Sequence, residues 1–339
     1  MIRIDDQVLL CNMTEPGLLS CLFFLKMLNG NIIKRKSKLG RNLIIFISVA
    51  IVVAVVAVFA IKFFQSSIEG HVSNKKVIKA WTSYDYQQVY SLTERQLENN
   101  PFNNFALVYH GFSSFYMALA QLDTLSAQSY LDDSINSLRI ALYNSRAKQK
   151  GQIEYILGKA YFYKNTITSY YYSDLAIKYL EAAKSDGYKA DDIYEYLGLS
   201  YAALDMTMES IAAFTEALIV RESYSLLLSI GEQYYKAGQQ NVAKQYLFRI
   251  VNDCADDNLV NKSLNLLGLI YIDEQNYTEA RKSFDVMLKK NQNSADAYYG
   301  IGVIYEKQGD LVKARSEWRK ALKLHVNHPG ALAKMAAYN

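Results

Sequence analysis

The sequence contains few of the residues that cross-link or interrupt a fold. Its 339 residues include three cysteines and three prolines. Cys11 and Cys21 lie near the N-terminus and Cys254 stands alone, so neither a disulfide framework nor the paired spacing of a zinc site is present. Two of the prolines, Pro101 and Pro329, are expected between helices, where a missing N–H costs least. The fold therefore does not depend on oxidation.

Motifs for common catalytic chemistry are also missing. There is no phosphate-binding loop, no Gly-x-Ser-x-Gly and no His-Glu-x-x-His. His325 and His328 could share a helix face, but no Cys or carboxylate cluster completes a metal site, so we expect two surface histidines. His110 is expected to be partly buried and structural. Asp191 and Asp256 are expected to cap helices. We predict no enzyme, no cofactor, no metal and no small-molecule substrate.

A basic surface is missing from most of the chain. The net charge of +4 belongs to residues 1–69, whereas residues 70–339 hold 29 basic and 29 acidic residues. Phosphate binding needs a basic face, so nucleic acid is not expected as a partner.

What the sequence does contain is a recurring pair of residues. Five glycines each have a tyrosine three residues later, and the glycines are 40, 33, 37 and 34 residues apart. A small residue and a tyrosine at fixed offsets with a period near 34 indicate a helical repeat array. The glycines are Gly158, Gly198, Gly231, Gly268 and Gly302.

The last full unit, residues 295–328, shows the pattern most clearly. Tyr298, Gly302 and Tyr305 lie at helical spacing, a turn at residues 308–310 follows, and Ala314 and Trp318 lie on one face of a second helix. This unit resembles the tetratricopeptide repeat (TPR), a helix-turn-helix of about 34 residues. Units that start at residues 151, 191, 224 and 261 match at the same packing positions. The small residues let two helices approach closely, and the large ones fill the gaps between neighbouring pairs.

Upstream of residue 151 the pattern weakens. We interpret Tyr86, Val89 and Leu97 as a second helix of a degenerate first unit, and we expect insertions at residues 118–130 and 165–172. The resemblance implies an all-α, TPR-type helical solenoid of about six to seven hairpins over residues 75–339, ending in a capping helix at residues 329–338. Residues Tyr170, Tyr171 and Tyr172 in the second insertion either prolong a helix or form a docking patch.

One apolar run precedes the repeats. Residues 43–61 contain Ser48 as their only polar member, and with Phe63 and Phe64 the run is long enough to span a bilayer. We predict a transmembrane anchor at residues 43–64 and a linker at residues 65–74. Basic residues concentrate just before the run, so residues 1–42 are expected in the cytoplasm and the repeats on the outer, periplasmic side of a bacterial inner membrane. The alternatives are a cleaved signal peptide and a translation start at Met27.

The TPR resemblance also implies a binding face. In that family the first helices of the hairpins line a concave groove that holds a protein or peptide. Phe105, Phe112 and Phe115 are expected to pack against the first unit. Aromatic side chains in such a groove suit a partner helix or an extended apolar peptide. The predicted groove residues are Phe112, Tyr116, Tyr155, Lys159, Phe162, Tyr163, Glu195, Leu199, Tyr235 and Tyr299.

These observations predict a membrane-anchored TPR scaffold or adaptor that binds protein partners and helps to organise a complex in the cell envelope. One alternative is a cytosol-facing co-chaperone or import receptor of reverse topology. The Lys and Asn that grip a chaperone's C-terminal carboxylate in some TPR proteins are missing here, which counts against it. The other alternative is a non-catalytic regulatory subunit of an envelope enzyme.

Overall fold

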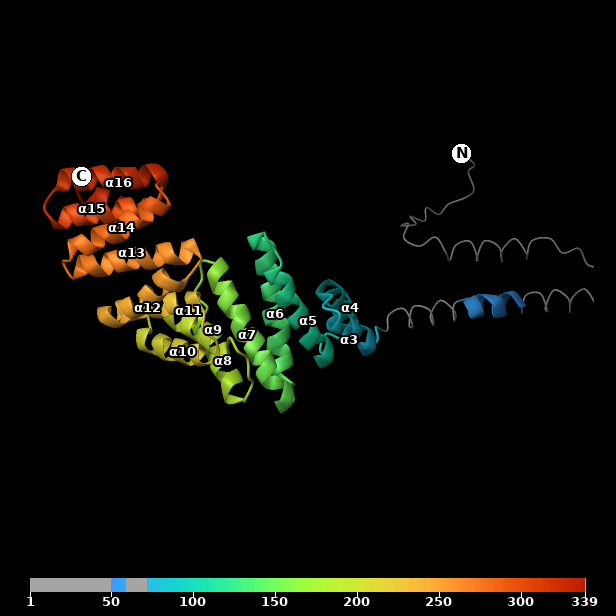
Figure 1. Cartoon of the computed structure of the whole chain (residues 1–339). Coiled ribbons are helices and arrows are strands. Elements are labelled where there is room, and N and C mark those ends of the chain that lie inside the picture. Colours follow the sequence, from blue (N-terminus) through green and yellow to red (C-terminus); the bar gives the residue numbers. More distant parts are fainter. Residues whose placement is uncertain (1–49, 59–71, 339) are drawn as a thin grey trace, which may run out of the picture. The chain divides into compact units, whose positions relative to one another are not determined.

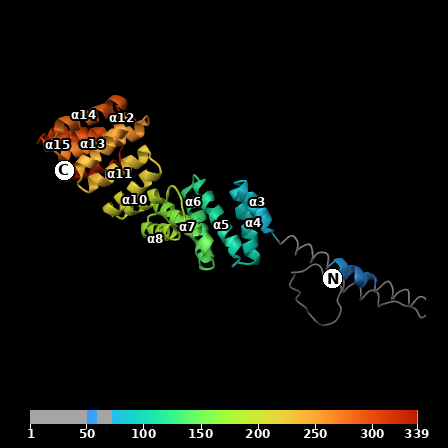
Figure 2. The ribbon, with the colours of Figure 1, turned by 60° about the horizontal axis from the view of Figure 1, so that its bottom comes forward.

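The computed structural model describes residues 50–58 and 72–338. The chain divides into two compact units, residues 1–69 and residues 70–339. The described part of the second unit is all α-helical and contains no strand. Its helices stack side by side into an elongated array (Figures 1 and 2).

Seven helical hairpins and one final helix make up residues 72–338. In each hairpin a first helix with an odd label is followed by a second helix with an even label. The helices are α3 (Asn74–Thr82), α4 (Tyr86–Asn99), α5 (Asn104–Leu119), α6 (Thr124–Tyr143), α7 (Ala147–Ile167), α8 (Ser173–Ser185), α9 (Ile193–Ala203), α10 (Thr207–Val220), α11 (Tyr224–Lys236), α12 (Gln240–Asp253), α13 (Asp257–Asp273), α14 (Tyr277–Lys290), α15 (Ala295–Lys307), α16 (Leu311–Leu324) and α17 (Pro329–Ala337).

The hairpins stack in sequence order. Each first helix packs on its own second helix, and each second helix packs on the first helix of the next hairpin. First helices also contact one another directly, as α5 with α7, α7 with α9, α11 with α13 and α13 with α15. The first helices therefore form one layer of the solenoid.

Close helix crossings explain the recurring glycines. A Cβ built on Gly198 would lie 2.4 Å from the ring of Phe214, and one on Gly268 would lie 2.4 Å from the ring of Phe284. Phe214 and Phe284 are themselves fully buried in the second helices of the same hairpins. Any larger residue at these glycines would force the two helices apart.

Five of the seven described hairpins have a left-handed residue in their turn, and the turns between α5 and α6 and between α7 and α8 do not. Asp205, Gly238, Gln275 and Gly309 have φ values of 55°, 72°, 59° and 85° and stand seven residues after the repeat glycines. Tyr84, with φ 58°, holds the corresponding place between α3 and α4. A left-handed residue ends the first helix and turns the chain back towards the second.

Several expectations from the sequence meet the structure here. The degenerate first unit is real, since α3 is a helix of only nine residues in front of α4. The first insertion lengthens α6, which has 20 residues. The second lengthens α7 and adds the loop 168–172, so the interpretation of Tyr170–Tyr172 as a helix extension is wrong. The capping helix predicted at residues 329–338 is confirmed as α17.

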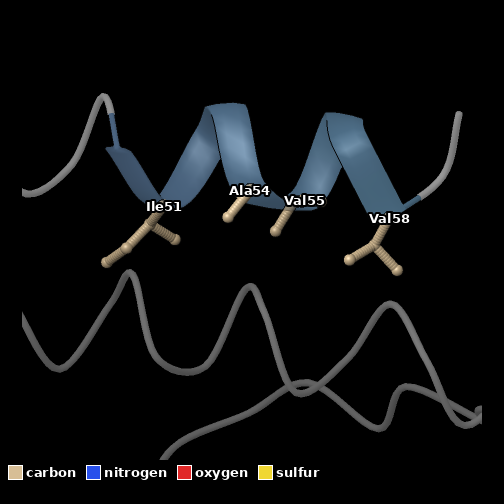
Figure 3. Close-up of a pocket in the computed structure, with 4 residues that line it drawn as sticks. All are labelled: Ile51, Ala54, Val55 and Val58. Atoms are coloured by element: carbon tan, nitrogen blue, oxygen red, sulfur yellow. The ribbon is translucent and has the colours of Figure 1, made fainter. Parts of the chain in front are cut away.

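The described piece of the first unit is a helical segment at residues 50–58. Ile51, Ala54, Val55 and Val58 lie on one side of it and line a shallow apolar hollow (Figure 3). Among the residues that the structure describes, no helix has the length and apolar character needed to cross a bilayer. Most of the anchor predicted at residues 43–64, all of residues 1–42 and most of the linker at 65–74 lie outside the described residues.

Candidate partner-binding face

The residues predicted for the groove all lie on first helices. We call the layer formed by α5, α7, α9, α11, α13 and α15 the first-helix face. Phe112 and Tyr116 come from α5, Tyr155 and Lys159 from α7, and the remaining residues from α7, α9, α11 and α15. Because consecutive first helices are neighbours, residues about 33 to 38 positions apart meet across this layer.

The N-terminal end of the face is aromatic. The Tyr86 and Tyr116 rings stack with their centroids 4.5 Å apart, and Trp81 lies 6.0 Å from Tyr116 and 5.9 Å from Phe112. Phe112 and Phe115 are buried, and Phe105 packs on the core of the first hairpin. Phe105 and Phe112 thus pack on the first unit as expected, whereas the ring contacts of Phe115 are with Tyr116 and with Tyr163 of α7. Tyr116 is half-buried, as are Trp81, Tyr86 and Phe105.

Lys159 lies at the centre of a polar network between α7 and α9. Its Nζ donates to Asp192 Oδ2 at 2.9 Å and to the Tyr155 hydroxyl at 3.1 Å, and Tyr155 donates its own proton to Asp192 Oδ1. The same Nζ lies 4.5 Å from the centroid of the Tyr196 ring, a cation–π geometry. Tyr155 exposes only 8 % of its surface. The charge of Lys159 is therefore already neutralised and is not offered to an anionic ligand.

Phe162, Tyr163 and Tyr196 form a partly accessible aromatic cluster on the face. The hydroxyls of Tyr163 and Tyr196 are 2.7 Å apart, and the Phe162 ring meets the Tyr196 ring edge-on with centroids 4.9 Å apart. All three side chains are half-buried. They are held in place by ring contacts while part of each ring stays in solvent, an arrangement suited to receive an apolar side chain.

Three tyrosines of this face, Tyr155, Tyr196 and Tyr235, have raised pKa values. Burial raises the pKa of Tyr155, and the hydrogen bond to Asp192 raises it further. Burial also raises the pKa of Tyr196, with Tyr163 as the next cause. In Tyr235 burial is again the first cause and the carboxylate of Asp273 the second. These hydroxyls stay neutral and add polar points to an apolar surface.

Polar contacts and one ring contact occupy the C-terminal half of the face. Tyr235 donates to Asp273 at 2.7 Å, and Glu195 lies 3.4 Å from Arg221. Leu199 is half-buried on α9. Tyr299 packs against the imidazole of His328 with ring centroids 4.9 Å apart. This half of the face is mixed in character.

The structure corrects two expectations about polar residues. His328 is buried, not a surface residue: its Nδ1 accepts from the N–H of Ala331, so its Nε2 donates to Asp296 at 3.0 Å. It caps α17, whereas His325 is exposed.

Asp256 caps α13, as expected. Asp191 does not cap α9. The N-cap residue of α9 is Asp192, whose side chain makes no capping hydrogen bond and instead binds Lys159. His110 is buried, as expected, and contacts Thr93 Oγ1 at 3.1 Å.

Two aromatic residues that contact predicted groove residues were not predicted from the sequence. Tyr86 belongs to the second helix α4 and stacks on Tyr116. Tyr196 lies one position beyond the expected groove position on α9 and meets Phe162 edge-on. A helical plot of α9 with Glu195 and Leu199 would have placed Tyr196 beside them. Within the described residues, no group of three or more His, Cys, Asp or Glu side chains could hold a metal ion.

Comparisons with known proteins agree with this architecture. Residues 265–331 match the family model described as tetratricopeptide repeat. The crystal structure of the C-terminal part of a TPR repeat-containing protein from Cytophaga hutchinsonii is similar with a TM-score of 0.53 and 12 % identity, over 76 % of this chain and 98 % of that chain. The chain thus contains TPR repeats, and its described C-terminal unit folds as a TPR-type solenoid.

Similar sequences share only stretches of the chain. A probable biofilm formation methyltransferase, WspC of Pseudomonas putida, is 39 % identical over 59 residues, which is 17 % of this chain and 14 % of that protein. The anaphase-promoting complex subunit CDC16 of Saccharomyces cerevisiae is 27 % identical over 143 residues, 41 % of this chain and 17 % of that protein. The chain spans less than a fifth of the length of either relative.

Proposed function

We propose that this protein is a non-catalytic scaffold or adaptor that binds protein partners through its first-helix face. The observation that carries the proposal is the half-buried ring cluster of Phe162, Tyr163 and Tyr196, held rigid on two adjacent first helices. Rigid aromatic side chains with one open side lose little conformational entropy when they bind. The TPR-type solenoid supports this reading, because such repeats present extended surfaces to protein partners.

The partner segment is apolar. Lys159 is engaged by Asp192 and covered by Tyr196, so the face offers rings and neutral hydroxyls where a carboxylate-binding site would offer free cations. A ligand that buries a leucine or aromatic side chain against Phe162, and that hydrogen-bonds to a tyrosine hydroxyl, matches this chemistry.

We further propose that residues 43–64 anchor the chain in a bacterial inner membrane. Support comes from the apolar run and from the basic residues Lys34, Arg35, Lys36, Lys38 and Arg41 in front of it. Residues 1–42 would then face the cytoplasm and the solenoid the periplasm. In this arrangement the protein helps to assemble a complex of the cell envelope close to the membrane.

Photocrosslinking in native membranes tests the partner-binding face. A photoreactive residue in place of Phe162 is expected to yield a discrete protein adduct. The control replaces Lys184 on the second helix α8, which lies outside the first-helix face, and is expected to yield none. The adduct should weaken with Tyr163→Ala, while far-ultraviolet circular dichroism stays unchanged. Equal adducts from both positions, or an adduct that survives Tyr163→Ala, would place the ligand elsewhere.

Reporter fusions test the topology separately. A phosphatase that is active only in the periplasm, fused after residue 339, is expected to be active, and a fluorescent protein that matures only in the cytoplasm is expected to stay dark there. The opposite pattern would support the cytosol-facing alternative. It would leave the partner-binding face itself untouched.

A further inference from the structure

Large apolar side chains project into solvent at the turns of the first four hairpins. They are Tyr84 between α3 and α4, Leu122 between α5 and α6, Leu125 in the first turn of α6, Tyr170 and Tyr171 between α7 and α8, and Met208 in the first turn of α10. Each exposes at least 60 % of its surface, and Leu122 is fully exposed. We call these six residues the apolar turn edge.

The repeat architecture places these turns on one edge of the solenoid. The hairpins are antiparallel and stack in order, so the turns inside hairpins follow one edge and the connections between hairpins follow the other. The apolar turn edge is therefore separate from the first-helix face, which lies on the flank of the helices. The two neighbouring turns of the same edge, at residues 237–239 and 274–276, expose no large apolar side chain.

Charge on this edge has a single sign. The four turns, taken as residues 83–87, 119–126, 168–174 and 203–209, contain no lysine or arginine. They do contain five acidic residues: Asp85, Asp123, Asp174, Asp205 and Glu209. Lys236 lies 3.2 Å from Asp205, so only that carboxylate has a basic neighbour in an ion pair within the described residues. Asp85 and Asp123 cap the N-termini of α4 and α6, and Asp174 and Glu209 lie in the first turns of α8 and α10, so the helix dipoles balance part of their charge. No lysine or arginine on these four turns balances the rest.

Tyr84 occupies the left-handed turn position that Asp205, Gly238, Gln275 and Gly309 hold in other hairpins. A tyrosine there is strained, and its ring is exposed, so packing does not repay the strain.

We propose that the apolar turn edge binds a basic amphipathic segment of a partner protein. The leucines, tyrosines and methionine receive its apolar side chains, and the flanking aspartates and Glu209 receive its lysines or arginines. Charge complementarity favours this occupant. An anionic bilayer surface is disfavoured, since it would meet five carboxylates and no basic side chain on these turns. A second copy of this chain is disfavoured because the edge would pair like charges.

Peptide binding to the full-length chain in lipid nanodiscs tests the proposal. The probe is a short synthetic helix with leucine on one face and lysine on the other, labelled with a fluorophore, and the matched probe replaces lysine by glutamate. The lysine probe is expected to bind more tightly, and its affinity should fall as salt is added. Empty nanodiscs provide the background.

Two triple variants locate the site. The edge variant is Leu122→Ser with Leu125→Ser and Tyr171→Ser. The control variant, Phe102→Ser with Tyr143→Ser and Ile219→Ser, removes equally exposed apolar residues from the opposite edge. The edge variant is expected to bind the lysine probe about tenfold more weakly or worse, since several apolar anchors are lost, and the control variant is expected to bind as the wild type does.

Other results would overturn the proposal. Equal loss in both triple variants, or equal binding of the two probes, would mean non-specific adhesion. If the edge variant alone no longer associates with anionic vesicles, and its probe binding is unchanged, the apolar turn edge would bind lipid and not a protein segment. If the wild type is a dimer and the edge variant is a monomer, again without a change in probe binding, the apolar turn edge would be an interface with a second copy of the chain. In each of these outcomes the photocrosslinked adduct at position 162 is expected to stay unchanged. Failure of this proposal therefore leaves the proposed function of the first-helix face intact.

Discussion

Single residues decide how closely the helices of a hairpin approach. Gly268→Val would place a branched side chain where a Cβ alone lies 2.4 Å from Phe284. Phe284 is fully buried and cannot move aside. We expect the variant to lose about 1–3 kcal/mol of unfolding free energy, measured by urea denaturation.

Gly231→Ala provides a milder substitution at an equivalent helix crossing, for comparison with Gly268→Ala. Its Cβ would lie 3.1 Å from Leu247, an aliphatic side chain, rather than 2.4 Å from a ring. It should cost less than Gly268→Ala under the same conditions. Equal costs, or an unchanged stability of Gly268→Val, would contradict the assigned helix crossing.

A second residue-scale prediction concerns the turn between α13 and α14. Gln275 holds φ at 59°, a conformation that a residue with a Cβ adopts at a cost and glycine adopts freely. Gln275→Gly is expected to raise the unfolding free energy by up to about 1 kcal/mol. Gly238→Ala, at the equivalent turn with φ 72°, should lower it. Thermal unfolding followed by circular dichroism measures both, and a shift of the same sign in the two variants would refute the argument.

His110 links stability to pH. Burial lowers its pKa below the ordinary value of 6.5, while Asp133 and Glu94 partly oppose the shift. The folded chain therefore binds fewer protons than the unfolded chain, and the stability from neutral His110 is present above about pH 6.5 and lost as the pH falls through that value. Urea denaturation at about pH 7.5 and about pH 5 should show a smaller loss in His110→Gln than in the wild type. An equal loss in both proteins would contradict this prediction.

At the scale of helices, α17 closes the open end of the array. It covers Trp318 and Ala321, its Lys334 pairs with Glu306 at 2.6 Å, and its N-terminus is capped by His328. Ending the chain after His328 should expose this apolar surface, lower the midpoint of thermal unfolding and promote association. Leu332→Ser, a change of a half-exposed residue on the same helix, should leave the midpoint nearly unchanged. A truncated chain as stable and monomeric as the full chain would contradict a capping role.

At the scale of helices, positions could be predicted from the sequence where close packing allows only glycine. Gly198 and Gly268 are required by close crossings, so the hairpins from residue 151 onward could be located from spacing alone. The insertions were not predictable in form, because extra residues can lengthen a helix, as in α6, or make a loop, as at 168–172. Helical spacing carries no signal that distinguishes these outcomes.

The candidate face was predictable in outline but not in its contacts. The first helices and most of their outward residues follow from the repeat register. The pairing of Lys159 with Asp192, and the stacking of Tyr86 on Tyr116, depend on how neighbouring hairpins twist against one another. That twist arises from packing along the whole array.

At the scale of the whole molecule, the solenoid offers two separate surfaces. The first-helix face is aromatic at its N-terminal end, where Lys159 is paired with Asp192, and the apolar turn edge is acidic. A scaffold that holds two segments at once brings them together at a high effective concentration. With an anchor at residues 43–64, both surfaces would be presented near one membrane.

Hydrogen exchange of the full-length chain, with and without the partner captured at Phe162, tests the central claim most directly. Binding across the first-helix face predicts slower amide exchange in α7 and α9, with little change in the second helices α8 and α10. Protection confined to the second helices, or no protection in α7 and α9 at saturating partner, would contradict the account.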